Sequence, residues 1–231
     1  MSAAPAPEDL DRVAEQAFGQ VRPGMRLGLG TGRAAEAFIR RLGRAVAEGL
    51  DAVGVPTSQR SEKLARELGI PLGSLDTIEA LDLAVDGADE VAPDLSLIKG
   101  LGGAMLRERV VAAAASRFVV LVTEEKLVTR LGERAPLPIE VVGFALPTVR
   151  RALSGVGLEA TLRQVDGRDF LTDNGHPVLD ARLPVGIEPR GLDARIRALP
   201  GVVDTGFFFD RASAVIVGAA GEVRVLEPAP R

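Results

Sequence analysis

Several residue types that carry common enzyme chemistry are missing or scarce in this sequence. Its 231 residues include no Cys, Trp or Tyr and one His, and only three of its 28 basic residues are Lys. Without Cys there is no disulfide, no thiolate nucleophile and no Cys-ligated zinc. The single His176 cannot form a His-based metal site, a Ser-His triad or a His acid–base pair. Acid–base chemistry in this protein therefore has to use carboxylates, Lys or water.

Long apolar runs and strong charge of one sign are absent as well. No run approaches the roughly 20 residues of a membrane-spanning helix, and the first residues lack the basic and apolar segments of a signal peptide. The formal net charge is −4, and the Arg residues are scattered among Asp and Glu with no aromatic platform beside them. We therefore expect a cytoplasmic globular protein that binds neither membranes nor nucleic acid.

Short apolar segments alternate with helical patterns over the first 130 residues. Strands are predicted at 25–29, 53–55, 81–85 and 118–123, and helices at 7–22, 34–46, 58–68 and 104–115. Short buried strands that alternate with helices are typical of parallel sheets. The pattern predicts an α/β fold with a Rossmann-like, mostly parallel sheet and helices on both faces.

The pattern changes after Leu131. Strands are predicted at 139–142, 159–164, 169–172 and 176–179, and helices at 147–153 and 189–199. Asp173-Asn174-Gly175 is a hairpin-turn sequence, which places His176 in an exposed turn. These elements predict a smaller inserted α+β (ferredoxin-like) domain over 132–207. Residues 1–131 and 208–231 then form the Rossmann-like domain, to which some of the strands predicted at 202–209, 214–217 and 223–226 return.

The glycine-rich segment Gly28-Leu29-Gly30-Thr31-Gly32 lies at a predicted junction between a strand and a helix. Backbone N–H groups and the helix dipole favour an anion at such a place. The dinucleotide pattern G-x-G-x-x-G fails because residue 33 is Arg, and the G-K-[ST] of a P-loop is missing. Two interpretations stay open: an ordinary glycine turn, and a small-molecule phosphate site with side-chain donors from Thr31 and Arg33.

The most informative segment runs from Leu83 to Glu108. A buried strand ends at Asp86-Gly87-Ala88-Asp89-Glu90, Lys99-Gly100-Leu101-Gly102-Gly103 follows, and Glu108 lies on the next predicted helix. Ligands of open α/β sheets bind beyond the carboxyl ends of strands, and a Lys head is a compact point charge that suits a tight pocket. This constellation predicts an active site. A solvated acidic turn, a Mg²⁺ site and a surface position for Glu108 are the alternatives.

These motifs resemble the ribose-5-phosphate isomerases of the A type. In order, the matching segments are Gly28–Gly32, Gly54–Ser58, Asp86–Glu90, Leu97–Gly103, Glu108, Ser116–Phe118, Lys126, Leu137–Val141, Asn174-Gly175 and Pro200–Val203. They follow one another at family-like intervals over residues 10–218. Each motif alone is weak, and together they are specific.

The resemblance implies an isomerase of the non-oxidative pentose phosphate pathway that interconverts D-ribose 5-phosphate and D-ribulose 5-phosphate through an enediolate. It implies no metal and no organic cofactor, and a homodimer or a dimer of dimers. By position, Glu108 matches the general base, Asp86 and Asp89 match carboxylates that handle the sugar hydroxyls, and Lys99 matches the residue near the developing oxyanion. Substrate-binding positions are implied at Thr31, Gly32, Arg33, Ala34, Gly87, Ala88, Gly100, Leu101, Gly102 and Lys126.

The phosphate loop departs from the family pattern. After Thr the family usually continues Gly-Ser-Thr, whereas this chain reads Gly32-Arg33-Ala34, and the family's first-helix Lys aligns with about Leu10. Our hypothesis is that Arg33 replaces both contacts through a charge-assisted bond to phosphate. Three other functions remain as alternatives to this isomerase: a sugar-phosphate-binding regulatory module, an acyl-CoA transferase of related fold, and an isomerase of another phosphosugar.

Overall fold

The computed structural model of the chain describes residues 7–228, which form two compact units. Among these residues, the first unit consists of 7–88, 107–127 and 210–228, and the second of 89–106 and 128–209. The chain therefore passes between the units both inside the Asp86–Glu90 motif and just before Glu108.

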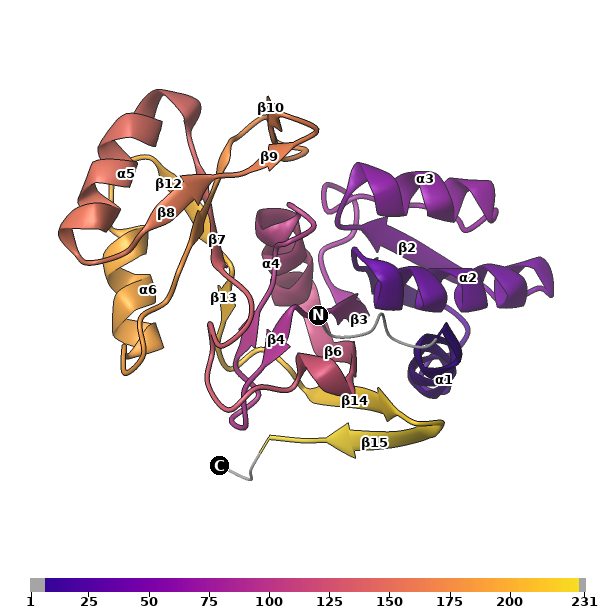
Figure 1. The fold of residues 1–231 in the computed structure, drawn as a ribbon. Helices are drawn as coiled ribbons and strands as arrows, with labels where there is room; N and C mark the ends of the chain where they lie inside the picture. The colour runs from indigo at the N-terminus through magenta and orange to yellow at the C-terminus, as the bar shows by residue number, and fades with distance from the viewer. Residues whose placement is uncertain (1–6, 229–231) are drawn as a thin grey trace. The chain divides into compact units, whose positions relative to one another are not determined.

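A six-stranded sheet organises the first unit, in the order β15-β14-β6-β3-β1-β2. Its strands are β1 (Met25–Leu29), β2 (Ala52–Pro56), β3 (Leu81–Gly87), β6 (Ala115–Thr123), β14 (Ala214–Ala219) and β15 (Glu222–Leu226). All neighbours pair in parallel except β15, which runs antiparallel to β14 at the edge (Figure 1). The predicted parallel sheet is confirmed, and the last two strands do return to it.

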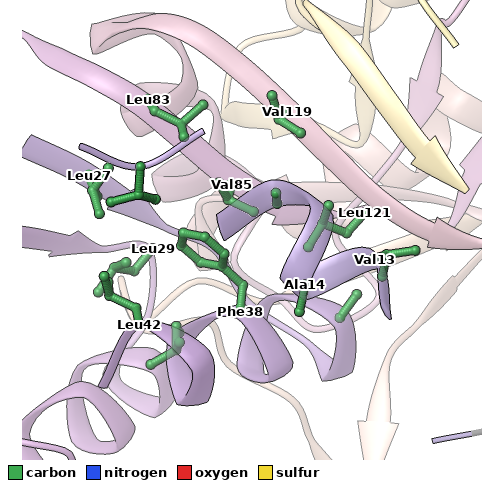
Figure 2. Packing of buried hydrophobic residues seen from close by; sticks show 14 of the residues in the cluster. Val13, Ala14, Leu27, Leu29, Phe38, Leu42, Leu83, Val85, Val119 and Leu121 are labelled. Atoms are coloured by element: carbon green, nitrogen blue, oxygen red, sulfur yellow. The ribbon is translucent and has the colours of Figure 1, made fainter. Parts of the chain in front are cut away.

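Helices cover both faces of this sheet, as predicted. They are α1 (Pro7–Phe18), α2 (Arg33–Ala47), α3 (Gln59–Glu67) and α4 (Met105–Ala114). Alternate strand residues such as Leu27, Leu29 and Val85 point to α1 and α2, where Phe38 fills the centre of the core (Figure 2). Gly28 points to the other face, where Val111 of α4 packs on it. Within residues 7–228, no helix has the length and hydropathy needed to cross a membrane.

The second unit contains the predicted ferredoxin-like arrangement. Its elements are β7 (Leu137–Val141), α5 (Leu146–Gly155), β8 (Ala160–Leu162), β11 (Val178–Ala181), α6 (Pro189–Arg197) and β12 (Val202–Thr205). The antiparallel strand order is β12-β7-β11-β8, and residues of α5 and α6 share one core with Leu137, Ile139 and Val141. Two short 3-10 helices, η1 (Glu124–Lys126) in the first unit and η2 (Gly143–Ala145) in the second, complete the described helical segments.

Two predicted strands of the second unit are divided or shifted in the structure. Instead of a strand at 169–172, a small hairpin pairs β9 (Gln164–Val165) with β10 (Arg168–Asp169). Asp166 and Gly167 between them both have positive φ, 51° and 72°, as a tight two-residue turn requires. The strand predicted at 202–209 is interrupted at Gly206, where an added Cβ would lie 2.4 Å from the Lys99 carbonyl oxygen.

The residues beyond that break join a sheet that was not predicted. β13 (Phe207–Phe208) pairs with β5 (Leu97–Ile98), which pairs with β4 (Glu90–Val91). These antiparallel pairings and the burial of Ile98 with Phe207 in one core tie 89–106 to the second unit. The prediction had placed this segment in the first domain, since two-residue strands leave no periodic pattern in a sequence.

Candidate active site

In the first unit, the predicted site residues gather at one edge of the parallel sheet. Gly30–Ala34 follow β1, Asp86 lies at the end of β3, and Lys126 follows β6. Because β1, β3 and β6 are adjacent and parallel, their carboxyl ends meet at the same edge. The order β2-β1-β3 also places the topological switch point between β1 and β3, where ligands of such sheets bind.

Gly30 and Gly32 of the first motif serve different structural purposes. A Cβ on Gly30 would lie 2.2 Å from Oδ1 of Asp86, so only glycine lets the loop pass this carboxylate. Gly32 is the N-cap of α2 with φ 103° and ψ 173°, a conformation open only to glycine, and no side chain among the described residues caps this helix end. The backbone N–H groups at the start of α2 are therefore suited to an anion. Arg33, the first residue of α2, is exposed, and Ala34 is buried.

Asp86 and Glu108 border the same closed, tightly packed space in the first unit, which is too small to hold a water molecule, together with Gly28, Gly30 and Thr57. Asp86 is 2% exposed, and its Oδ1 accepts hydrogen bonds from the N–H groups of Thr31 at 2.9 Å and Gly87 at 2.7 Å. Glu108, in the first turn of α4, is 4% exposed. The surface position considered for Glu108 is thereby excluded, and two buried carboxylates are available for proton transfer.

In the second unit, Lys99 and the glycine loop after it are held by the strands described above. Lys99 is buried, its N–H donates to the Gly206 carbonyl at 2.9 Å, and its Nζ lies 5.6 Å from the centre of the Phe208 ring. Oδ2 of Asp89 accepts from the Leu101 N–H at 2.9 Å. Gly100 has φ 101°, which the turn after Lys99 requires. A hydrogen bond therefore joins Asp89 to the glycine loop, and Lys99 is held separately by Gly206.

Sequence reasoning missed Arg163, which positions this glycine loop. Its Nη1 donates to the carbonyl oxygens of Gly100 at 3.0 Å and Leu101 at 2.9 Å. Its other nitrogens bind Asp180 on β11 at 2.8 and 2.5 Å. Arg163 lies about sixty residues from the loop, and no motif distinguishes it from the many other Arg residues.

Three hydroxyl side chains near the loop that follows β1 were also missed as a group. Oγ1 of Thr31 lies 2.8 Å from both Thr57 Oγ1 and Ser58 Oγ, and Ser61 Oγ is 3.3 Å away. Thr57 and Ser58 belong to the recognised Gly54–Ser58 motif, which marked them without giving them a role. Ser61 had no signal at all. The hydroxyl of Thr31 therefore points towards α3 and its N-cap.

The alternative of a solvated acidic turn fails for Glu90. This side chain is 1% exposed, and its carboxylate accepts hydrogen bonds from the N–H groups of Gly132, Arg134 and Ala135, each at 2.6 Å. Glu90 thus anchors the loop before β7. Within residues 7–228, no three His, Cys, Asp or Glu side chains form a group that could hold a metal ion.

His176 is not the exposed turn residue that was predicted. Its Nδ1 lies 3.0 Å from Oε1 of the fully buried Glu140, and its side chain is 29% exposed. The same oxygen accepts from Thr172 at 2.9 Å and Asn174 at 3.1 Å. Glu140 on β7 draws the hairpin turn inwards, a tertiary contact that local turn chemistry does not reveal.

Comparison with known proteins agrees with these observations. A sequence model described as ribose 5-phosphate isomerase A (phosphoriboisomerase A) matches residues 53–222. Ribose-5-phosphate isomerase A of Roseiflexus castenholzii is 52% identical over 218 residues, which cover 93% of each chain. The solved ribose 5-phosphate isomerase A of Methanocaldococcus jannaschii has a TM-score of 0.90 at 43% identity, with 96% of this chain and 100% of that chain covered. A solved D-ribose-5-phosphate isomerase in complex with phospho-erythronic acid has a TM-score of 0.93 at 40% identity, with 97% and 100% covered. This chain belongs to the ribose-5-phosphate isomerase A family.

Proposed function

We propose that this protein interconverts D-ribose 5-phosphate and D-ribulose 5-phosphate by metal-free proton transfer through an enediolate. The observation that carries the proposal is the pair of buried carboxylates, Asp86 and Glu108, which border the same closed space beside the glycine loop. Family membership over nearly the whole chain supports the substrate. The reaction needs one positioned base, a cationic group or donors where negative charge develops, and an anchor for the phosphate.

Glu108 acts as the general base in this proposal. It removes the proton from C2 of the ring-opened aldose and returns it to C1, while the hydroxyl proton on O2 moves to O1. Asp86, together with Asp89, handles the sugar hydroxyls and ring opening. The N–H groups of Thr31 and Gly87 both donate to Oδ1 of Asp86 and keep the carboxylate in one orientation.

Lys99 stabilises the negative charge that develops on the carbonyl oxygen. Its burial against Phe208 gives it a defined position, and an ammonium group fits such a site better than a guanidinium. We expect Lys99→Met to lower kcat on the order of 10²–10³-fold, as loss of an oxyanion contact does. Lys99→Arg, the charge-conserving control, is expected to restore little of that loss. Wild-type kcat in Lys99→Met would contradict this role.

The phosphate group is bound at the start of α2, with further substrate contacts from Gly87, Ala88, Gly100–Gly102 and Lys126. Arg33 supplies a charge there that the usual Ser-Thr pair would not. Arg33→Ala is therefore expected to raise KM for D-ribose 5-phosphate, with kcat nearly unchanged. An unchanged KM would show that the backbone N–H groups bind phosphate without this side chain.

Two further parts of the proposal follow from the family. The enzyme acts in the non-oxidative pentose phosphate pathway, and it assembles as a homodimer or a dimer of dimers. Sedimentation equilibrium distinguishes a monomer from both assemblies.

The decisive experiment follows D-ribose 5-phosphate by proton NMR in D₂O with EDTA present. Wild type is expected to form D-ribulose 5-phosphate with deuterium at the transferred position, and Glu108→Gln to be slower by about 10²–10⁴-fold. The matched control is Glu222→Gln on the exposed edge strand β15, which is expected to keep wild-type activity. Binding of the sugar phosphate without turnover by wild type would instead favour the regulatory module.

The relative solved with phospho-erythronic acid suggests a second measurement. This acid carries a carboxylate where the substrate would develop enediolate charge, and enzymes bind such mimics more tightly than substrates. We expect phospho-erythronic acid to inhibit this protein competitively, with an inhibition constant below KM. Non-competitive inhibition would contradict a shared site.

A further inference from the structure

Four hydroxyl side chains of the first unit form one cluster, which we call the hydroxyl cluster: Thr31, Thr57, Ser58 and Ser61. Thr57, Ser58 and Ser61 are 1%, 6% and 1% exposed. They come from the end of β2 and the first turn of α3, whereas Thr31 belongs to the phosphate loop after β1. The cluster therefore links two segments that are about thirty residues apart in the chain.

The hydroxyl protons of the cluster can be assigned in sequence. Ser61 Oγ donates to the Gly30 carbonyl at 2.5 Å, because that oxygen has no proton to give. The proton between Ser58 and Ser61, 3.0 Å apart, then comes from Ser58. Thr31 donates to Ser58 at 2.8 Å. Thr57 has two acceptors, Thr31 Oγ1 at 2.8 Å and the Leu29 carbonyl at 3.2 Å.

All four hydroxyl protons thus have acceptors inside the protein. The chain of donors starts at Thr31 and ends at the carbonyl of Gly30, the residue before it, so it closes on the same loop. Successive hydrogen bonds in a buried series of this kind polarise one another, and the series holds its side chains in one conformation. A phosphate could receive the Thr31 proton only if the bond to Ser58 broke.

The loop is held from the opposite side as well. The Thr31 N–H donates to Oδ1 of Asp86 at 2.9 Å, and the Gly30 N–H donates to the Val85 carbonyl at 2.9 Å. Strand β3 therefore holds the backbone of Gly30 and Thr31, and the hydroxyl cluster holds the side chain of Thr31 and the carbonyl of Gly30. Gly32 and the first N–H groups of α2 follow directly from this clamped pair.

We propose that the hydroxyl cluster is a positioning device for phosphate binding, in which Thr31 orients the loop instead of donating its hydroxyl to the phosphate. Ser61 is a positioning residue in the same device. The phosphate is then bound by the backbone N–H groups at the start of α2 and by Arg33. This inference rests on the proposed isomerase function and refines how its substrate is held.

Ser61→Ala is the most direct test. It removes the bond to the Gly30 carbonyl but keeps the N-cap of α3, where the Ser61 N–H donates to Ser58 Oγ at 3.1 Å. We expect KM for D-ribose 5-phosphate to rise about 5–10-fold, the effect of one buried hydrogen bond, with kcat within about twofold of wild type. The inhibition constant of inorganic phosphate should rise by the same factor, which general structural damage would not produce.

Variants at Thr31 separate positioning from direct binding. Thr31→Val removes the hydroxyl and should raise KM as Ser61→Ala does, while Thr31→Ser, which keeps it, should stay near wild type. Thr31→Val and Ser61→Ala break the same series of hydrogen bonds. The effect of the double variant on KM should therefore be clearly smaller than the two single effects combined. Two results would overturn the inference in favour of a direct contact between Thr31 and phosphate. One is full additivity of the two effects on KM, and the other is a KM that rises in Thr31→Val but not in Ser61→Ala.

Ser213→Ala is the matched control. Ser213 also belongs to the first unit, and its Oγ accepts from the Phe118 N–H at 3.1 Å, but it lies at the amino end of β14. Its KM should remain at the wild-type value. Wild-type kinetics in both Ser61→Ala and Thr31→Val would reject the positioning role while leaving the isomerase intact. If wild type lacks isomerase activity, the proposed function fails first, and the affinity of inorganic phosphate for the same variants still tests the cluster.

Discussion

At the scale of single residues, the charged side chains that we propose for catalysis are almost fully buried. Asp86, Lys99 and Glu108 are 2%, 2% and 4% exposed. Burial of a charge is costly unless hydrogen bonds or opposite charges compensate it. Asp86 receives two backbone N–H groups, and Lys99 contacts an aromatic face. Each of these side chains is therefore held in a defined position within its own unit.

Gly30→Ala should damage this arrangement directly. The added methyl group would lie 2.2 Å from Asp86 Oδ1 and 2.5 Å from Asp86 Cα, and backbone cannot move aside as a flexible side chain does. We expect a loss of about 1–3 kcal/mol of unfolding free energy, as overpacking typically causes, together with a large fall in kcat/KM. Urea unfolding and steady-state kinetics check both effects.

Gly155→Ala is the control for this substitution. Gly155, the last residue of α5, has no heavy atom within 4 Å of an added Cβ and no positive φ. Its stability should be unchanged or slightly higher, because Ala restricts the unfolded chain. Equal losses in both variants would mean that the contact with Asp86 is unimportant.

At the scale of secondary-structure elements, helix ends show how local sequence and hydrogen bonding combine. Helix α6 begins after Glu188, whose carboxylate accepts the N–H groups of Arg190 at 2.8 Å and Gly191 at 2.5 Å, with Pro189 in the first turn. The two hydrogen bonds hold the pKa of Glu188 below its ordinary value, and the bond from Gly191 has a larger effect than the bond from Arg190. The ionised carboxylate is the form that caps the helix.

The sign of the pH dependence follows from this lowered pKa. Glu188 contributes stability at neutral pH, above its unfolded pKa, and loses this contribution as pH falls through the lower folded pKa. We expect Glu188→Gln to be less stable than wild type at pH 7, and the difference to shrink as pH falls below the ordinary Glu range. Thermal unfolding from pH 7 to pH 3 measures this, with exposed Glu159→Gln as control. A difference independent of pH would contradict the capping role.

Over the whole molecule, the chain passes between the two units next to its most informative residues. Asp86 belongs to the first unit and Asp89 to the second, and the chain returns to the first unit just before Glu108. Binding of substrate to the folded protein stabilises it by mass action, whichever units supply the contacts. Stability in the presence of ligands therefore reports on the site as a whole.

We expect D-ribose 5-phosphate at 100 times its dissociation constant to add about 2.7 kcal/mol of stability. For a chain of this length the gain corresponds to a rise in Tm of roughly 5–10 °C. D-Ribose at the same concentration should raise Tm much less, because it lacks the phosphate group. Scanning calorimetry measures both, and equal shifts would show that the phosphate loop adds no binding energy.

Whether a strand or helix could be predicted depended on how many residues its sequence pattern spans. Strands β1 and β3 appeared as mostly apolar segments of five residues, each interrupted by one charged residue, Arg26 or Asp82. The helix predicted at 58–68 corresponds to α3, whose N-cap Ser58 accepts the Ser61 N–H. The strands β4, β5 and β13 have two residues each and left no comparable signal. The pairing of β13 with β5 also joins residues more than a hundred apart, since Phe207 pairs with Ile98.

The sequence by itself determined the family, the α/β class and the residues that we propose for catalysis, because these depend on residue type and spacing along the chain. Only the tertiary structure decided where polar side chains find partners. It buried Glu108, directed Glu90 to the loop at 132–135, paired His176 with Glu140 and turned the Thr31 hydroxyl towards Ser58. Hydrogen bonds act over about 3 Å in space, and separation along the chain does not limit them. For that reason no local pattern could reveal these partners.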